Sequence, residues 1–382
     1  MYKRLKSIHS VRLYTLGIGC LIASLLYQTD INHMGTKIAL GSMFLVVLGT
    51  IININNSRCK KSATFISLVV LFVLTSLIST LYNGTSPHYL NRYIAFFITY
   101  VFICNFKISI YENEILKDIF SIAMSIYAVL TSYSYIYNPI TTNYIHSDVE
   151  LFGTLMDPNY ISIPFVAAAN LCTSRIIEKK DIIINIVMLI INLLAILCAA
   201  SRGAVVAMII SIVLHFCLSK KISVSKIIFI GFIILIIQYI FLPIVKVSFG
   251  EQFIRMSEFG IEDDSGRFEL WNKAIELFIS FPILGIGLGG MVDAAGHAAH
   301  NTYVQVLTET GIFGFILFTI LVYKMLKRVF VIDKQLFIMF AGYLVQIFFV
   351  DALGDRLLWI MFIWIAVITK NKENLETKEQ RL

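Results

Sequence analysis

Long apolar runs recur along the whole chain and constrain its fold more than any other feature. Each run is roughly 17–25 residues long, the length that a helix needs to cross a bilayer. Of the 382 residues, 58% are hydrophobic and only 14% are charged, whereas soluble domains carry about 25% charged residues. Only helices and closed barrels satisfy their backbone hydrogen bonds in lipid, and these runs are too long for barrel strands. We therefore predict an all-α polytopic membrane protein.

The apolar runs predict about twelve transmembrane helices in a single integral membrane domain over residues 1–382. The first run follows basic residues, as in a signal peptide, but no small-residue cleavage site comes after it, so we expect an uncleaved span. Six cysteines without paired spacing predict neither a disulfide framework nor a metal site. The expected spans lie near residues 11–28, 36–53, 63–83, 89–105, 115–137, 152–172, 182–200, 203–218, 225–245, 302–323, 331–350 and 357–369.

The positive charges between the spans predict their orientation. Of the 31 Lys and Arg residues, 23 fall on one side of the expected spans, and the positive-inside rule makes that side cytoplasmic. Both termini, including the tail at 370–382, are then cytoplasmic. The net charge of +7 is mostly this topological signal, so it does not indicate a nucleic-acid partner. The opposite side holds only Lys37, Arg92, Arg202, Lys246, Arg255, Arg267, Lys273 and Arg356.

Residues 246–300 form the one large extracytoplasmic loop that the span pattern predicts. Its stretch 266–280 has the periodicity of an amphipathic helix lying on the outer membrane interface, with Asp264 or Ser265 as its cap. A solvated surface helix, with Arg267 paired to a nearby acid such as Asp263 or Glu269, is the alternative. The expected apolar face consists of Phe268, Trp271, Ile275 and Phe278.

The segment "HAAHNTYVQVLTETGIFGFILF" at 297–318 carries polar residues into an apolar run. A helix beginning near His300 places Asn301, Gln305 and Thr308 on one face, with Glu309 beside them. Polar groups inside a membrane usually face a bundle interior or a wet cavity, so this helix is expected to line an outward-opening cleft with His300 at its mouth. A lone histidine there more often packs at the interface or bonds a carbonyl, but other polar features lie on the same side.

Ser201 and Arg202 stand at the outer junction of two expected spans, and Arg267 lies in the outer loop. On its own, Arg202 could be an ordinary flanking arginine whose guanidinium group reaches the membrane interface. Two arginines with a titratable His300 on one face suit an anionic, lipid-linked substrate, because guanidinium groups bind phosphate with paired hydrogen bonds. Histidine can take a proton from an attacking hydroxyl near neutral pH.

Asp157, Pro158 and Asn159 interrupt the outer half of the span expected at 152–172. Proline in a helix removes a backbone hydrogen bond that neighbouring groups must replace. Two interpretations stay open: a structural kink, or a broken helix end that faces the same cleft.

These residues resemble the O-antigen ligase and O-antigen polymerase (Wzy-type) family over about residues 150–320. The family motif of His, then Asn, Ser or Gln, nine residues and Gly-x-x-Gly matches His300–Asn301 and Gly311–Gly314. The family's Ser-Arg-Gly matches 201–203. Its Gly-Arg followed by Trp matches 266–267 and Trp271, and its Pro-x-x-Gly-x-Gly matches 282–287. The ligase motif continues with Thr where this chain has Phe315.

The resemblance implies a GT-C-type glycosyltransferase fold in the bacterial cytoplasmic membrane, with an extracytoplasmic active site and no metal or other cofactor. The donor would be a glycan on undecaprenyl diphosphate, and the acceptor a glycan or lipid. Partners would include the lipid bilayer, a chain-length regulator and a flippase. Arg202 and Arg267 would bind the diphosphate, and His300 would activate the acceptor hydroxyl. Substrate binding is expected from Asn301, Gln305, Ser201, Asp157, Asn159 and Trp271.

Phe315 and the Asp-Pro-Asn element favour a polymerase of O-antigen, capsule or exopolysaccharide repeat units. A ligase that transfers glycan to lipid A core is the first alternative. A lipid-linked oligosaccharide flippase is an alternative from another class, although such transporters typically show internal repeats and ionisable groups near the bilayer midplane. A peptidoglycan polymerase of the shape-and-division type shares the lipid carrier but lacks the histidine motif.

Overall fold

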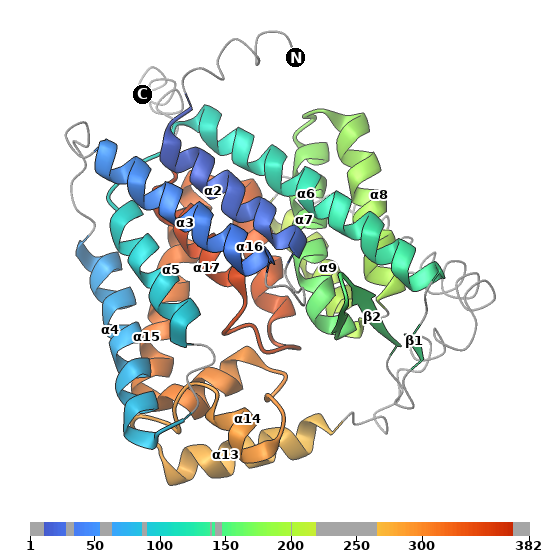
Figure 1. Cartoon of the computed structure of the whole chain (residues 1–382). Coiled ribbons are helices and arrows are strands. Elements are labelled where there is room, and N and C mark those ends of the chain that lie inside the picture. Colours follow the sequence, from blue (N-terminus) through green and yellow to red (C-terminus); the bar gives the residue numbers. More distant parts are fainter. Residues whose placement is uncertain are drawn as a thin grey trace.

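The computed structural model describes residues 11–27, 34–53, 63–85, 90–137, 140–141, 147–199, 201–218 and 266–369. The span expected at 225–245, residues 246–265 of the outer loop and the tail at 370–382 lie outside these ranges. The elements, drawn in Figure 1, are α2 (Leu13–Ala23), η2 (Ser24–Tyr27), α3 (Met34–Ile52), α4 (Ala63–Asn83), α5 (Leu90–Ile103), α6 (Ile110–Tyr137), β1 (Ile140–Thr141), β2 (Ser147–Leu151), β3 (Thr154–Met156), α7 (Pro158–Ile177), α8 (Ile182–Cys198), α9 (Arg202–Leu218), α13 (Arg267–Ser280), α14 (Gly290–Ala295), α15 (Thr302–Ile332), α16 (Lys334–Gln346) and α17 (Arg356–Val367).

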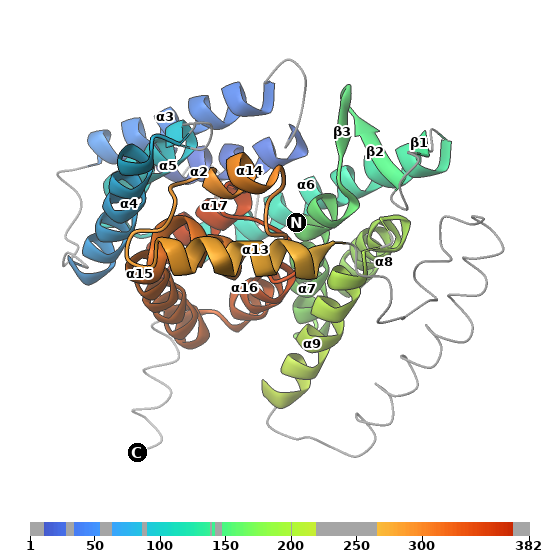
Figure 2. The ribbon, with the colours of Figure 1, turned by 90° about the horizontal axis from the view of Figure 1, so that it is seen from below.

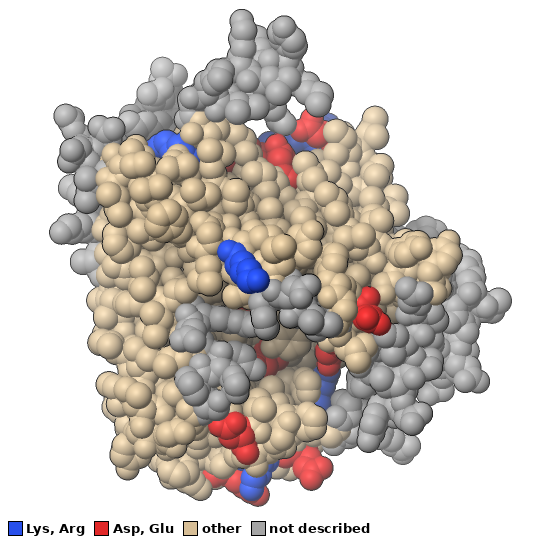
Figure 3. Space-filling view, viewed as in Figure 1, with Lys and Arg blue, Asp and Glu red and all other residues tan. Residues whose placement is uncertain are grey.

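The helices are those of a membrane protein. Within the described ranges, five are long and apolar enough to cross a bilayer: 34–52, 65–83, 110–137, 158–177 and 302–332. Shorter apolar helices lie at 13–27, 93–103, 182–198, 202–218 and 356–367. In the space-filling view most of the described surface is uncharged, and charged side chains are scattered over it in small groups (Figure 3). Each predicted span inside the described ranges overlaps a helix, and the total of twelve stays a prediction.

The core is built around α17, which is buried on every side, as a helix that is apolar all round must be. All of its residues up to Ile365 are buried. The ring of Trp359 stacks on Phe96 of α5 with the centroids 6.0 Å apart. Trp364 donates from Nε1 to the Asn113 side-chain oxygen of α6 at 2.8 Å. The apolar sequence of this last helix is therefore explained by packing against protein rather than by contact with lipid.

A small sheet corrects one predicted span. The three strands are antiparallel in the order β1-β2-β3, so the chain does not enter a helix at residue 152. The helix begins at Pro158, after Asp157, whose side chain accepts from the Asn159 amide at 2.6 Å. Aspartate is a preferred N-cap and proline fits the first helical turn. The Asp-Pro-Asn element is thus the start of a helix, and the kink interpretation is wrong.

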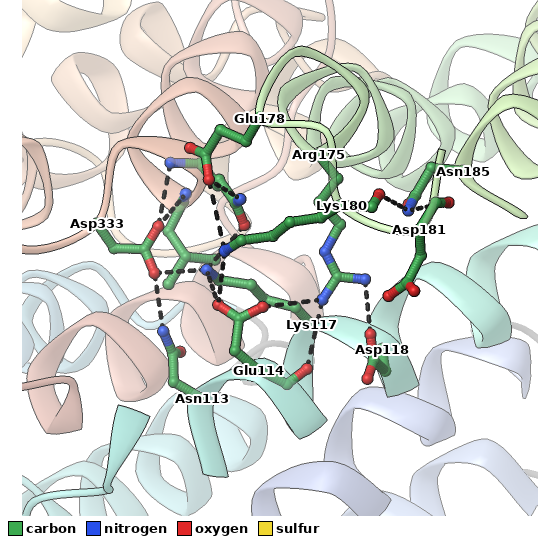
Figure 4. A network of polar contacts seen from close by, with 12 residues as sticks. Asn113, Glu114, Lys117, Asp118, Arg175, Glu178, Lys180, Asp181, Asn185 and Asp333 are labelled. Carbon is green, nitrogen blue, oxygen red and sulfur yellow. Dashed lines mark hydrogen bonds and ion pairs between the residues drawn. The ribbon is translucent and has the colours of Figure 1, made fainter. Parts of the chain in front are cut away.

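Buried ion pairs join the helices at the end where α7 finishes (Figure 4). Lys117 of α6 is buried, and its ammonium lies 2.8 Å from a Glu114 oxygen and 2.6 Å from an Asp333 oxygen. Arg175, near the end of α7, pairs with Asp118 at 2.6 Å. Because a buried charge is costly unless it is paired, these contacts fix α6, α7 and the α15–α16 junction together. Because α7 is 20 residues long, its start lies about 30 Å from its end, on the opposite side of the molecule.

α15 bends at Gly311, which has φ +64° and ψ −170° inside an otherwise helical run. The loop at 282–287 fills this bend. The amide of Ile312, separated from its ordinary helical acceptor, donates instead to the Pro282 carbonyl at 2.9 Å. The Pro-x-x-Gly-x-Gly motif and the Gly-x-x-Gly at 311–314 are therefore two halves of one packing arrangement.

The same loop satisfies the carbonyl groups that the bend exposes. The Ile286 amide donates to the Thr308 carbonyl at 3.0 Å, and the Gly287 amide donates to the Glu309 carbonyl at 3.0 Å. In a straight helix these carbonyls would accept from residues four positions later. Buried backbone groups need such partners, so the loop and the bend depend on each other.

The last turns of α4 hold the loop from the other side. Asn83 donates from its side chain to the Gly285 carbonyl at 3.0 Å, and the Leu288 amide donates to the Thr80 hydroxyl at 3.0 Å. Ser79 donates to a carbonyl at the bend, also at 3.0 Å. These contacts connect the N-terminal half of the chain to the segment that carries His300.

The tight packing at the bend predicts that Gly285→Ala destabilises the protein more than Gly296→Ala. Both glycines have positive φ, +73° and +75°, so both variants meet the same backbone cost of about 1–2 kcal/mol. A Cβ on Gly285 would also lie 2.5 Å from the Gly311 nitrogen, whereas one on Gly296 meets nothing within 4 Å. Thermal unfolding of the purified protein in detergent should show a clearly lower Tm for Gly285→Ala. Equal Tm values for the two variants would contradict this packing.

Candidate active site

Four helices begin at the same end of the molecule: α7, α9, α13 and α15. Figure 2 looks at this end, where α13 crosses the face near α7, α9, α14 and α15. We call it the site end. The predicted residues 157, 159, 201, 202, 267, 300 and 301 all lie in the first turns of these helices or immediately before them. Residues separated by up to 144 positions in the sequence are brought to one end because the helices alternate in direction.

His300 lies just before α15 and is partly buried. It interacts electrostatically with Asp157 at the start of α7, with Arg267 at the start of α13, and with His297. Burial lowers the pKa of His300 below 6.5; Asp157 acts in the opposite direction, and Arg267 and His297 lower the pKa further. The imidazole is therefore neutral near pH 7 and available as a proton acceptor. Three of the predicted site residues come together here.

The backbone of Ala299, immediately before His300, is held on both sides. Its carbonyl accepts from the Trp271 indole Nε1 at 2.8 Å, and its amide donates to the Gln305 side-chain oxygen at 2.7 Å. The other end of the Gln305 amide donates to Glu309 at 2.5 Å. The polar atoms of Trp271 and Gln305 are thus bonded to protein, although both were expected to bind substrate.

Asn301, immediately after His300, caps α15. Its side-chain oxygen accepts from the amides of Tyr303 and Val304 at 3.0 Å and 3.2 Å. Thr302 fixes the same turn, since its hydroxyl donates to the Val350 carbonyl at 2.8 Å beyond the end of α16. The polar residue that the family motif places after the histidine therefore has a helix-capping role in this structure.

Ser201, Arg202 and Asn159 form the neighbouring part of the site end. The Ser201 hydroxyl donates to the Asn159 side-chain oxygen at 3.0 Å and accepts from the Ala204 amide at 3.3 Å. This contact joins the starts of α7 and α9. Arg202 is the first residue of α9 and is partly exposed. The serine and asparagine thus position the turn from which the arginine extends.

α13 corrects the predicted apolar face. Its bounds, Arg267–Ser280, agree with the expected helix, but Gly266 occupies the cap position. The buried side consists of Ala274 with Leu270, Trp271 and Leu277 packed around it. Phe268 and Ile275, which were assigned to the same face as Trp271, are 58% and 48% exposed. The helix buries one side on α15 and leaves a separate apolar side uncovered, because its apolar residues extend around more than one face.

The helix starts make the site end favourable for an anion. Each helix N-terminus carries a partial positive charge and donor amides. Arg202 and Arg267 add full charges at the first positions of α9 and α13. The cap position of α13 is Gly266, which has no side chain to accept from the first amides. Asp157, Ser201 and Asn301 already accept from amides at the starts of α7, α9 and α15. The charges of Arg202 and Arg267 are therefore what suits the site end to a diphosphate.

Sequence reasoning missed the residues that support this site from elsewhere. Thr80 and Asn83 of α4 carry no signal, because each is an ordinary polar residue near a helix end and more than 200 positions from its partner. For Glu309 the sequence did carry a signal, because an ionisable residue in an apolar run indicates function or a polar contact.

Among the residues that the structure describes, no group of three His, Cys, Asp or Glu side chains is placed to hold a metal ion.

Comparison with known families agrees with the motifs. Residues 187–319 match the family model described as O-antigen ligase. The match extends from α8 through the bend in α15 and contains Arg202, Arg267 and His300. It confirms the resemblance to the O-antigen ligase and polymerase family. No curated protein matches the chain.

The contacts of Ala299 predict that Trp271→Phe loosens the His300 segment without unfolding the protein. The variant keeps a ring beside Phe348, 6.1 Å away in the native protein, and removes one hydrogen bond worth about 1 kcal/mol. Diethyl pyrocarbonate should modify His300 several-fold faster, as followed by mass spectrometry of the peptide. Lys273→Ala, an exposed change on the same helix, is the control. An unchanged modification rate in Trp271→Phe would contradict the positioning role of the indole.

Proposed function

We propose that the protein polymerises undecaprenyl-diphosphate-linked oligosaccharide repeat units by inverting glycosyl transfer at the outer face of the bacterial cytoplasmic membrane. The observation that carries this proposal is the meeting of His300, Arg267 and Asp157 at the site end, the first two of them inside the segment that matches the O-antigen ligase family. A glycan of O-antigen, capsule or exopolysaccharide type would be the product.

The two arginines would bind the leaving group. Arg202 and Arg267 each begin a helix at the site end, so their charges add to the helix dipoles. Guanidinium groups bind phosphate oxygens in pairs and keep their charge at every physiological pH. Preorganised positive charge where negative charge develops is a large term in catalysis. Undecaprenyl diphosphate would thus be stabilised as it departs from the sugar.

His300 would act as the general base. Its neutral imidazole takes the proton of an acceptor hydroxyl, whose oxygen then attacks the anomeric carbon of the donor sugar. The bond between that carbon and the diphosphate oxygen breaks, and its electrons leave with undecaprenyl diphosphate. The configuration inverts because attack and departure occur on opposite faces. Asp157, which interacts with His300, stabilises the imidazolium that forms.

The acceptor distinguishes polymerase from ligase. We favour another lipid-linked repeat as the acceptor, because Phe315 stands where the ligase motif has Thr. The match to the family described as O-antigen ligase fits both reactions. In the ligase alternative, lipid A core receives the chain. In either reaction the arginines and His300 have the same roles, and a flippase and a chain-length regulator would act before and beside the enzyme.

Complementation of a deletion strain tests this function. His300→Ala, Arg202→Ala and Arg267→Ala should each abolish or strongly reduce long surface glycan at normal expression, since a lost base or oxyanion donor costs about 10²–10⁴ in rate. The measurement is the length ladder of the glycan and the lipid that carries it. In the deletion strain, single repeats on the normal acceptor indicate a polymerase, and long chains on undecaprenyl diphosphate indicate a ligase. Full ladders from all three variants would overturn the proposed site and favour a transporter.

The surroundings of His300 predict opposite pH shifts for two variants. Activity should fall as the pH drops through the pKa of His300, because the protonated imidazole cannot accept a proton. Asp157 raises that pKa and His297 lowers it. Asp157→Asn should therefore move the acid limb of the rate profile to lower pH, and His297→Gln should move it to higher pH. Shifts of the same sign, measured with membranes and extracted donor lipid, would contradict the assignment of His300 as the base.

A further inference from the structure

The His300 backbone has a conformation that other groups must hold in place. Its φ is +49°, a left-handed value that non-glycine residues adopt at a cost. Such conformations persist only where the surrounding structure determines them. The residue after it, Asn301, is fixed by its capping bonds to α15. The residue before it, Ala299, is fixed by Trp271 and Gln305.

Gln305 can hold Ala299 in this way only with its amide in one orientation. Its oxygen accepts from the Ala299 amide at 2.7 Å, so its NH₂ group must face the other way. There it meets a Glu309 oxygen at 2.5 Å. The same glutamate oxygen lies 3.5 Å from the Met291 amide, which donates to it. This Glu309 oxygen therefore accepts from both sides, and it selects the orientation of Gln305 that suits Ala299.

We infer that Glu309 and Gln305 are positioning residues for His300, acting through the Ala299 backbone from one turn inside α15. This inference rests on the proposed function, in which His300 is the base. Both residues are buried, with 2% of each exposed, and the two ends of the Gln305 amide are bonded within the protein. Glu309 stands at the bend of α15, next to Thr310 and Gly311. Gln305 and Glu309 thus connect the bend in α15 to the proposed base, His300.

The charged and titratable groups around the pair are few among the described residues. Glu309 borders a cavity of about 10 Å³ together with Asp351 and Tyr93, room for about one water molecule. The groups that act electrostatically on His300 are Asp157, Arg267 and His297. The groups around Glu309 differ from those that act on His300. A change at 305 or 309 therefore alters the position of His300 and leaves the charges beside its imidazole unchanged.

An exchange of the two side chains tests the inference. Gln305→Glu places two carboxyl groups together, and Glu309→Gln introduces an amide that can pair with either end of the Gln305 amide, so the orientation of Gln305 is no longer selected. In the double variant Gln305→Glu/Glu309→Gln, the carboxyl group at 305 accepts from the Ala299 amide and from the NH₂ group of the new amide, so the pairing of the two side chains is restored with donor and acceptor exchanged. We expect each single variant to lose most of the transfer rate, and the double variant to recover most of it.

Two further variants separate position from stability. Gln305→Met keeps the volume and removes both hydrogen bonds, so kcat should fall about tenfold or more with KM nearly unchanged. The acid limb of the pH–rate profile of Gln305→Met should move to higher pH, toward the ordinary histidine pKa of about 6.5, because a loosened His300 is less buried. Thr310→Val is the matched control, since its hydroxyl bonds only the Val306 carbonyl of its own helix. Membranes with donor lipid extracted from the deletion strain supply the assay.

The outcomes distinguish this inference from the proposed function. Recovery in the double variant, with the Gln305→Met shift, supports the positioning role. A folded double variant as inactive as the single variants, or Gln305→Met with wild-type kcat and pH profile, overturns it. If the double variant does not accumulate in the membrane, the kcat and the pH profile of Gln305→Met test the inference on their own. Full activity in His300→Ala overturns the proposed function itself, whatever the variants at 305 and 309 show.

Discussion

The site depends on the contact between the bend in α15 and the loop at 282–287. A helix bent at Gly311 loses backbone hydrogen bonds in an apolar environment, where each unsatisfied group is costly. The loop supplies two amides and one carbonyl to replace them. The bent helix is therefore stable only when the loop is present, and the loop has a defined conformation only when the helix is bent. Glycines at both contact points are required because a Cβ on Gly285 or Gly311 would lie within 2.5 Å of the other segment's backbone.

This contact also determines where the chemistry lies. It fixes the first turns of α15 relative to α13 and α14, and His300 stands just before those turns. The opposite ends of α6, α7 and α15 are joined by the buried charges around Lys117. The helices are thus held firmly at one end, while the other end presents four helix starts, two arginines and a histidine. An anionic donor would meet positive charge and a neutral base in the same place.

Much of this arrangement could be predicted from the sequence. Apolar runs identified the helices, and the spacing of three motifs identified His300, Arg202 and Arg267, because membrane helices force polar residues to gather at ends and cavities. The hairpin at 147–156 could not be predicted, since its few residues look like the outer part of an apolar span. The roles of Asn301, Gln305 and Trp271 were also beyond the sequence. A polar side chain at a site binds substrate or protein according to geometry, and here all three make hydrogen bonds to the backbone around His300.

The most direct test is the release of undecaprenyl diphosphate by the purified protein, given lipid-linked repeat units as the sole substrate. The account predicts one released carrier for each new glycosidic bond, an inverted anomeric centre by NMR, and no release by His300→Ala. Equal release by the wild-type protein and His300→Ala would contradict it, as would elongation that leaves the carrier count unchanged.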